Sequence, residues 1–189
     1  MRLPHNILAA LWLIWLLSWV AAAGWSARTQ TRQPGADQLQ HSVFIWAGAI
    51  MLFAHPTLLG PLLQPVYPYR SAIGWSAVAL ALLGLGWTWW ARLRLGALWS
   101  AAVTLKQGHT LVRTGPYAIT RHPIYTGLFL ALVATAAMQD SGAAVLGLLL
   151  FLVGLVVKIR QEEQLLTRAF GTRYRDYQAR VPALIPGLW

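Results

Sequence analysis

Five long apolar segments divide the chain, and they constrain its fold more than any other feature. A helix needs about 20 apolar residues to cross the hydrocarbon core of a bilayer, within a range of about 17–25. The five candidates cover residues 6–25, 43–63, 72–91, 124–138 and 142–157. The last two are short and must extend into their flanks or lie where the bilayer is thinned or covered by protein. The pattern predicts an all-α fold, a polytopic membrane helix bundle.

The composition supports an embedded chain. Hydrophobic residues make up 57% of the 189 residues and charged residues only 11%, whereas a soluble domain has about 45–50% and about 25%. So few charges could not cover the surface of a soluble protein of this size, and so much apolar sequence excludes disorder. The lack of cysteine in the sequence excludes a disulfide scaffold, a thiolate zinc site, an iron–sulfur cluster and a cysteine nucleophile.

Basic residues are unevenly distributed along the chain. The net charge is +10, and in so apolar a chain this favours anionic lipid over nucleic acid as the partner. If all five segments span and the C-terminus is cytoplasmic, 13 of the 15 Lys and Arg residues lie in the stretches 26–42, 92–123 and 158–189. Arg2 and Arg70 lie on the other side. The positive-inside rule therefore predicts a multi-pass protein with a cytoplasmic C-terminus and an outside N-terminus.

The first apolar segment has a competing interpretation. Arg2, an apolar stretch and the alanines at 21–23 resemble a signal peptide. However, the apolar run is longer than the usual signal-peptide core of about 7–15 residues. Trp12, Trp15 and Trp19 also recur at helical spacing, which suits a packed or interfacial helix face. We expect this segment to be retained as a helix.

Two long stretches that carry polar residues adjoin the last three apolar segments. Loops this long are usually functional or disordered, and their apolar and aromatic content argues against disorder. We therefore divide the chain at residue 92. Residues 1–91 hold three N-terminal transmembrane helices, and residues 92–189 hold a long loop, a transmembrane hairpin and a C-terminal cytoplasmic helix, where we expect the function to lie. A polar turn at 139–142 closes the hairpin.

The first of these stretches leads from a turn into a helix. Gly115 and Pro116 form a turn signal, and Pro123 suits the first turn of a helix because its missing N–H would be unpaired there. Arg121 and His122 then lie at a helix N-terminus, where free N–H groups and the helix dipole favour an anion. Spacing alone leaves two alternatives open: these residues bind a ligand, or Arg121 reaches lipid phosphate and His122 caps the helix.

The second stretch continues the last apolar segment as a helix that ends at Gly171, a residue typical of helix C-termini. Glu162 and Glu163 are the carboxylates of this helix, about one turn beyond the apolar run. Glu162 could simply pair with Lys158 four residues earlier, but ionisable groups at membrane depth are functional candidates. Adjacent helical residues point about 100° apart. We therefore expect one Glu to face a ligand and the other a neighbouring Arg.

The histidines argue against two other classes of membrane protein. A metal oxidase needs clustered ligands, and the five histidines lie singly, at His5, His41, His55, His109 and His122. A transporter would place polar groups near the bilayer midplane, and only His55 falls there. We expect His55 to bond a carbonyl freed by the proline that follows it rather than to act in function. A non-catalytic membrane scaffold remains an alternative.

Four motifs together give the C-terminal half a resemblance to a known family. In order they are Gly-Pro-Tyr at 115–117, Arg-His-Pro-x-Tyr-x-Gly at 121–127, Glu-Glu at 162–163 and Phe-Gly-x-x-Tyr-x-x-Tyr at 170–177. Roughly residues 86–187 resemble the isoprenylcysteine carboxyl methyltransferases, integral-membrane enzymes related to phospholipid N-methyltransferases. One departure is Ala183, where many relatives carry Arg. It concerns a substrate contact rather than the fold.

The resemblance implies S-adenosylmethionine as the methyl donor and S-adenosylhomocysteine as the product. It implies carboxyl O-methylation of an isoprenylcysteine-like lipophilic substrate, with N- or S-methylation of a phospholipid or another small molecule as the alternative. The methyl transfer would be a direct displacement at the methyl carbon, and its rate depends on alignment of the reactants and exclusion of water. We expect a lipophilic or prenylated substrate and the lipid bilayer as partners, and neither nucleic acid nor a metal.

The resemblance also implies a cofactor pocket between the stretch 108–127 and the helix that carries the two glutamates. Arg121 and His122 would bind the cofactor's carboxylate, and a glutamate its ammonium or ribose diol. Arg168 and Arg173 are the candidates for orienting a substrate carboxylate, although both could be surface cations at a membrane face. The candidate cofactor-binding residues are His109, Leu111, Val112, Arg113, Gly115, Tyr117, Arg121, His122, Tyr125, Glu162 and Glu163.

Overall fold

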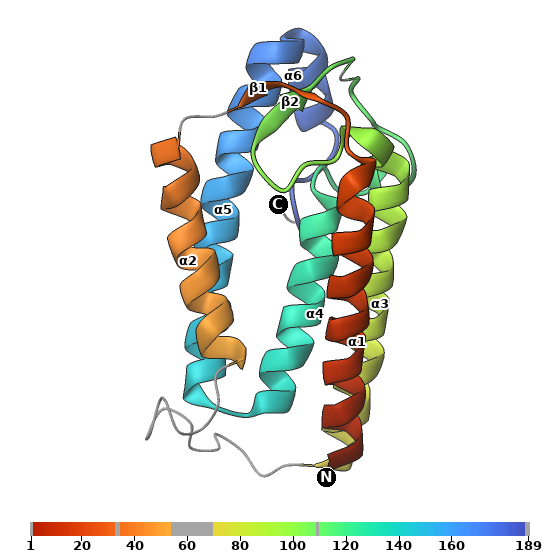
Figure 1. Cartoon of the computed structure of the whole chain (residues 1–189), viewed down its shortest axis with the longest axis vertical. Helices are drawn as coiled ribbons and strands as arrows, with labels where there is room; N and C mark the ends of the chain where they lie inside the picture. Colours follow the sequence, from red (N-terminus) through yellow and green to blue (C-terminus); the bar gives the residue numbers. More distant parts are fainter. Residues whose placement is uncertain (1, 33–34, 54–69, 109, 188–189) are drawn as a thin grey trace.

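A computed structural model describes residues 2–32, 35–53, 70–108 and 110–187. Within these residues, five long helices run alternately up and down the molecule and form a bundle (Figure 1). They are α1 (Arg2–Ala22), α2 (Gly35–Phe53), α3 (Ser71–Leu95), α4 (Pro123–Gln139) and α5 (Gly142–Phe170). The predicted all-α membrane bundle is confirmed.

Shorter elements gather at one end of the bundle. Two short strands, β1 (Thr29–Arg32) and β2 (Thr104–Lys106), pair antiparallel and link the segment after α1 to the segment after α3. Helix α6 (Thr172–Gln178) follows α5. Single 3-10 turns cover Ala23–Trp25, Gly96–Leu98 and Gly115–Ala118.

Three of the helical stretches are long and apolar enough to cross a membrane: Leu3–Trp25, Ser71–Leu98 and Gly142–Phe170. Helix α4 is apolar but has 17 residues, and α2 begins at Gly35 rather than at residue 43. The remainder of the predicted second segment, including His55, lies outside the described residues. Together with the exposed apolar side chains along α1, α2 and α5, these helices mark an integral membrane protein.

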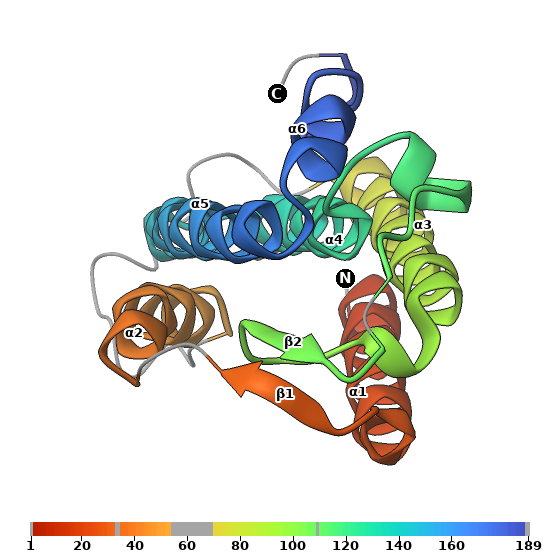
Figure 2. The same cartoon turned by 90° about the horizontal axis from the view of Figure 1, so that it is seen from above.

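The helices pack in pairs at close range. Helix α2 packs on α5, α3 on α4, and α1 beside α3, as the end-on view shows (Figure 2). A Cβ on Gly84 would collide with the backbone of Gly127 in the facing helix, and the reverse also holds. Gly48 and Gly147 make the same close approach between α2 and α5. Small residues thus allow the backbones to meet, which is how membrane helices commonly associate.

The last two long helices form the predicted hairpin. Asp140 ends α4 in a left-handed conformation, with a φ of 46°. Ser141 then caps α5, because its hydroxyl oxygen accepts the N–H of Ala144 at 3.2 Å. Helix α5 runs on beyond its apolar part and ends at Gly171, whose φ is 57°. Pro123 opens α4. Each of these boundaries was predicted by the sequence.

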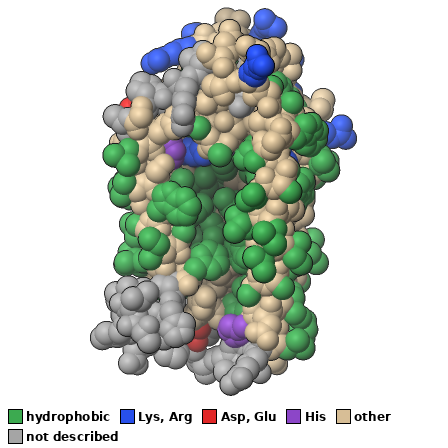
Figure 3. All heavy atoms as spheres, viewed as in Figure 1, with side chains coloured by type: hydrophobic (Ala, Val, Ile, Leu, Met, Phe, Trp, Pro, Cys, Tyr) green, Lys and Arg blue, Asp and Glu red, His purple; other side chains and the backbone are tan. Residues whose placement is uncertain are grey.

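The two ends of the bundle differ in charge. In Figure 3, Lys and Arg side chains lie at the upper end, above a broad hydrophobic middle. The segments between α1 and α2, between α3 and α4, and after α5 all lie at that end (Figure 1). The stretches that carry 13 of the 15 basic residues therefore meet there. That this end faces the cytoplasm stays a prediction.

Candidate active site

The charged end contains a cavity of about 300 Å³ enclosed by α1, α4, α5 and the segment that follows α3. This volume is at the lower end of the range of about 300–1,000 Å³ for small-molecule sites. The polar residues that line it are Tyr117, Arg121, His122, Tyr125, Lys158 and Glu162. The facing wall is apolar and aromatic, and includes Trp15, Trp19, Leu98, Trp99, Val103 and Leu128. The cavity thus has a polar wall and an aromatic wall.

Glu162 is the carboxylate of the polar wall, and two residues at the start of α4 hold it. The hydroxyl of Tyr125 donates to Glu162 Oε1 at 2.5 Å, and His122 Nδ1 lies 3.5 Å from Oε2. The rings of His122 and Tyr125 stack with their centroids 5.7 Å apart. Because these two residues are about one helical turn apart, both reach the same carboxylate.

Glu163 has different partners from its neighbour. Nε and Nη2 of Arg121 each lie 2.7 Å from Glu163 Oε1, His122 Nε2 lies 3.2 Å from the same oxygen, and Gln178 donates to Oε2 at 3.1 Å. The prediction that one glutamate faces a neighbouring Arg is confirmed for Glu163. That Glu162 faces a ligand stays a prediction.

Arg121 fastens the C-terminal segment to the start of α4. Its Nη1 donates to the carbonyls of Gln178, at 3.1 Å, and Val181. The backbone continues the contact, since Arg121 N–H donates to Pro182 and His122 N–H donates to the carbonyl of Ala183, at 2.8 and 3.0 Å. The Arg121 guanidinium is thus engaged by protein groups on several sides. This geometry favours a structural role for Arg121 over binding the carboxylate of a ligand.

Burial and charge also alter the protonation of two residues in the polar wall. Burial alone would lower the pKa of His122, but hydrogen bonds and charge from Glu162 and Glu163 outweigh burial and raise that pKa above 6.5. Burial, with smaller contributions from Glu162 and Tyr177, raises the pKa of Tyr117, so its hydroxyl stays protonated. The polar wall therefore combines two carboxylates with an imidazole whose charged form they favour.

Three tryptophans form the aromatic wall. The indole N–H of Trp15 in α1 donates to the hydroxyl of Thr88 in α3 at 2.7 Å. The ring of Trp19 lies 5.0 Å from that of Trp15 and 5.2 Å from that of Trp99. The guanidinium of the fully buried Arg92 lies 4.7 Å from the centre of the Trp99 ring. These contacts hold the wall in place without any ligand.

Lys158 and the paired strands close the cavity from the charged end. Lys158, which the sequence offered as a partner for Glu162, donates to the carbonyl of Ala101 at 2.7 Å and lies 5.4 Å from the centre of the Tyr125 ring. Thr104 of β2 lines the cavity. Beyond the strands, Gln107 N–H donates to the carbonyl of Arg28 at 3.0 Å. The segment after α3 is thereby tied to both α5 and the end of α1.

The structure brings together about half of the predicted cofactor-binding residues. Tyr117, Arg121, His122, Tyr125 and Glu162 line the cavity, and Glu163 lies behind them. Gly115 has a φ of 62° and lies against the side chain of Arg94. His109 is outside the described residues. Four further candidates are described but are not among the residues that line the cavity: Leu111, Val112, Arg113 and Gly115.

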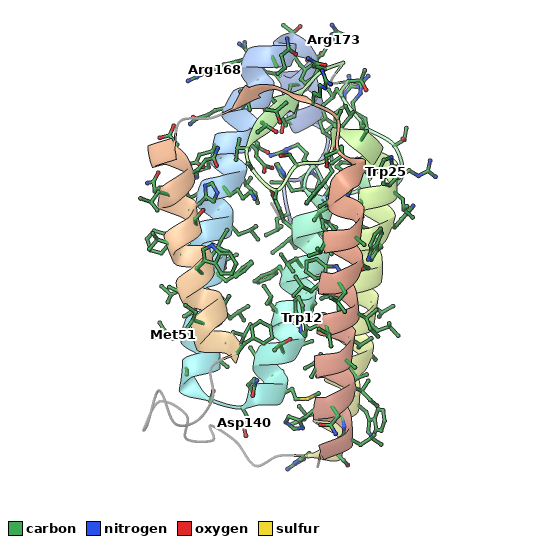
Figure 4. All side chains as sticks on the ribbon, viewed as in Figure 1. Trp12, Trp25, Met51, Asp140, Arg168 and Arg173 are labelled. Carbon is green, nitrogen blue, oxygen red and sulfur yellow. The ribbon has the colours of Figure 1, made fainter. Side chains whose placement is uncertain are left out.

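The two predicted substrate-orienting arginines lie away from the cavity. Figure 4 labels Arg168 near the end of α5 and Arg173 in α6, both at the charged end of the molecule. Both side chains are exposed. Arg168 borders a separate shallow hollow with Arg160 and Glu163. Their role in catalysis stays a prediction, and this geometry favours surface cations.

The sequence does not predict the aromatic wall as part of a site. The spacing of Trp12, Trp15 and Trp19 on one helix face indicates only packing or an interfacial position. This helical spacing is the sequence pattern that could have identified Trp15 and Trp19 as neighbours in one cavity. No comparable local signal marked Trp99 or Lys158, because both reach the cavity through packing with distant segments.

Comparison with known families fits this geometry. Residues 77–168 match the model of the isoprenylcysteine carboxyl methyltransferase family, which takes in α4, most of α3 and most of α5. The chain belongs to this family. The match includes the polar wall from Tyr117 to Glu162 and ends before α6. It excludes α1, and therefore Trp15 and Trp19.

Proteins that are similar in sequence to this chain carry several different names. It is 38% identical over 114 residues to a nickel-cobalt-cadmium resistance protein of Alcaligenes xylosoxydans xylosoxydans, covering 59% of this chain and 53% of that protein. It is 40% identical over 77 residues to methanethiol S-methyltransferase 2 of Bradyrhizobium diazoefficiens, covering 39% and 27%. It is 32% identical over 119 residues to the protein-S-isoprenylcysteine O-methyltransferase of Schizosaccharomyces pombe, covering 59% and 48%. The chain thus spans about half, or less, of each relative's length.

One of these relatives has a name that concerns metals, which raises the question of a metal site. Among residues 2–32, 35–53, 70–108 and 110–187, no group of three or more His, Asp or Glu side chains is placed to hold a metal ion. The titratable cluster that is present, around Glu162 and Glu163, is instead occupied by hydrogen bonds from protein donors.

Proposed function

We propose that this chain is an integral-membrane methyltransferase that uses S-adenosylmethionine and methylates a lipophilic acceptor. One observation carries the proposal: a carboxylate, Glu162, is held by His122 and Tyr125 in a cavity whose opposite wall is aromatic. Membership of the family supports the proposal. The cavity lies at the end of the bundle that collects the basic residues, which we propose faces the cytoplasm.

The groups in the cavity fit the chemistry of this cofactor. Glu162 would accept hydrogen bonds from its ammonium or ribose hydroxyls. The indole faces of Trp15, Trp19 and Trp99 would pack against the lipophilic acceptor on the other side of the cavity. When bound, S-adenosylmethionine would supply a methyl group on a sulfonium. The hydroxyl of Tyr117, which stays protonated, would serve as a donor to a carboxylate.

The protein's own part in the reaction would be to orient and to exclude water. Alignment of two reactants can supply about 7–11 kcal/mol of a barrier, and the aromatic wall and Lys158 would keep water from the reacting atoms. A carboxylate acceptor is ionised at pH 7 and needs no base. The raised pKa of His122 extends its protonated form to higher pH, and in that form it cannot take a proton from a thiol or an amine. The site therefore suits an acceptor that arrives already ionised.

The best-supported acceptor is a lipophilic acid such as an isoprenylcysteine, and a small thiol is the second candidate. The family model and the yeast relative's name favour the acid. The name of the Bradyrhizobium relative and the small cavity favour the thiol. Either acceptor could enter from the bilayer between helices. Arg168 and Arg173 stay candidates for orienting a substrate carboxylate, although neither lines the cavity.

Transfer of a labelled methyl group tests the proposal. Purified protein is incubated with methyl-labelled S-adenosylmethionine and, in separate reactions, a farnesyl-cysteine analogue, phosphatidylethanolamine or a small thiol. We expect base-labile label on the acid, which identifies a methyl ester, or stable label on the thiol. S-adenosylhomocysteine binding is measured by calorimetry alongside. No binding of S-adenosylhomocysteine and no labelled product from any acceptor would reject the proposal.

A further inference from the structure

A hollow lined by hydrophobic side chains runs along the membrane part of the molecule, between α1 and α2 (Figure 3). It begins at the cavity, beneath the strands β1 and β2 that cross between the two helices (Figure 1). Leu128 joins the two regions, because it lines the cavity and also packs against the apolar cluster around Leu132 and Phe151. The hollow thus adjoins the candidate active site at Leu128.

Trp12 closes this hollow further down the bundle. Its indole packs against the apolar cluster of α1, α3 and α4 and also against that of α2, α4 and α5. Its ring meets Phe53 of α2 edge to face, with centroids 5.5 Å apart. Its N–H donates to the hydroxyl of Thr135 at 2.9 Å, and Thr135 is buried in α4. Trp12 therefore lies in a fixed orientation across the gap between α1 and α2.

The distance from the cavity to this closure is short. Trp12 is three residues from Trp15 and seven from Trp19, both of which line the cavity. At 1.5 Å per residue, these separations are about 5 and about 10 Å along the helix. Residues 6–27 carry no charged side chain. A group lying along this part of α1 must be uncharged and apolar, and it meets an indole within about two helical turns.

We propose that the Trp12–Phe53 contact sets the length of the apolar chain that the acceptor carries. This inference rests on the proposed function, because it assumes that the acceptor's reacting group lies in the cavity near Glu162. Its chain then runs down the hollow along Trp15 and ends against Trp12. Both contact residues lie outside the matched region 77–168. The polar wall belongs to the family match, whereas the closure lies outside it, in α1 and α2.

A chain-length series tests the proposal. The acceptors are straight-chain alkanethiols from two to twelve carbons and N-acetyl-S-alkyl-cysteines of the same alkyl lengths. For wild type, we expect kcat/KM to rise with length and then fall. Trp12→Ala and Phe53→Ala each remove one side of the contact, so both should move the optimum to longer chains. The ratio of long-chain to short-chain kcat/KM should change about tenfold, because a site discriminates a methylene by at least this factor.

Binding is followed separately from turnover. Thermal stabilisation by each acceptor should show the same shift in length preference as kcat/KM. Trp46→Ala is the matched control, since Trp46 is a tryptophan of α2 that is 68% exposed, and its length profile should match wild type. If Trp12→Ala does not fold, Phe53→Ala decides, because Phe53 is 47% exposed and its loss disturbs the core less.

Two results would overturn the inference, and they differ from failure of the proposed function. One is a wild-type profile with no dependence on chain length. The other is an unchanged optimum in both variants. In either case the protein still binds S-adenosylhomocysteine and transfers methyl groups. Absence of S-adenosylhomocysteine binding in wild type would instead reject the proposed function itself.

Discussion

The two walls of the cavity differ in how they are built. The polar wall is formed by the start of α4 and by one turn of α5. Charged hydrogen bonds among His122, Tyr125, Glu162 and Glu163 hold these residues together. The aromatic wall comes from α1 and the segment after α3, and ring contacts hold it, with one hydrogen bond from Trp15 to Thr88. The polar wall lies within the family match and most of the aromatic wall lies outside it.

This contrast separates two tasks. Charged groups that satisfy one another need fixed positions, so they suit a cofactor whose polar parts do not vary. An aromatic surface on a separate helix can change without disturbing those groups, so it suits an acceptor that varies among relatives. Variants in the polar wall should therefore affect stability and cofactor binding, and variants in the aromatic wall should affect the acceptor.

The largest effect is expected at Arg121. Its side chain and that of Glu163 are 11% and 17% exposed, and breaking a buried pair by removing one partner costs about 3–5 kcal/mol. Arg121→Met should also release the carbonyls of Gln178 and Val181, and with them the C-terminal segment. Thermal unfolding in detergent should show a large fall in Tm. Arg175→Ala, an exposed cation of α6, serves as the control. Equal Tm values for both variants would contradict this role.

Next in size is the effect of Glu162→Gln. The substitution keeps the shape of the side chain and removes its charge. Hydrogen bonds to a charged group contribute about 1.5–3 kcal/mol, so S-adenosylhomocysteine affinity measured by calorimetry should fall by about 10- to 150-fold. Gln164→Ala, at an exposed position on the same helix, should leave the affinity unchanged. If Glu162→Gln bound normally, the cofactor would not lie against the polar wall.

A smaller effect is expected at Thr88, which touches the aromatic wall only through Trp15. Thr88→Val keeps the shape of this fully buried residue and removes the acceptor of the Trp15 indole N–H. A neutral hydrogen bond contributes about 1 kcal/mol, so KM for the acceptor should rise about fivefold. Cofactor affinity should stay within about twofold of wild type. A change in cofactor affinity without a change in KM would remove the distinction between the walls.

Sequence patterns predicted the local parts of this structure. Pro123, Asp140, Ser141 and Gly171 mark helix ends through the backbone geometry that each residue favours, and the structure confirms all four positions. The helix ends were predicted because each depends on residues within one turn. The 100° between adjacent helical residues predicted that one glutamate would face an arginine, but only the packing of the start of α4 against α5 shows that it is Glu163, with Arg121.

The same patterns could not predict contacts between distant segments. Nothing local to Trp99 or Trp15 indicates that they share a cavity, since their proximity depends on how α1 packs beside α3. Conversely, Leu111, Val112 and Arg113 were expected in the pocket because the resemblance implies a cofactor pocket in the stretch 108–127, yet they do not line the cavity. The division of the chain at residue 92 stays a prediction, and α1 contributes to the cavity from the far side of that division.

The pH dependence of stability should distinguish the polar wall from the aromatic wall. His122 has a pKa raised above 6.5 in the folded protein, so the stability gained from its protonation is fully present below about pH 6.5. It is lost as pH rises through the raised pKa. Thermal unfolding between pH 5.5 and pH 9 should therefore show Tm falling with pH. His122→Gln should flatten this slope, whereas Thr88→Val should keep it. A slope that persists in His122→Gln would assign the titration to another group.

The smallest effect is expected at Arg168, beyond both walls. Its side chain is exposed at the end of α5 and does not line the cavity. Exposed ion pairs contribute about 0–1 kcal/mol, so Arg168→Ala should change KM for an acidic acceptor by no more than about fivefold. Measurement with an acid and with a thiol of equal chain length separates the two possible roles. A large loss for the acid alone would mean that Arg168 orients a carboxylate at the cavity mouth, and that acceptor recognition extends beyond the aromatic wall.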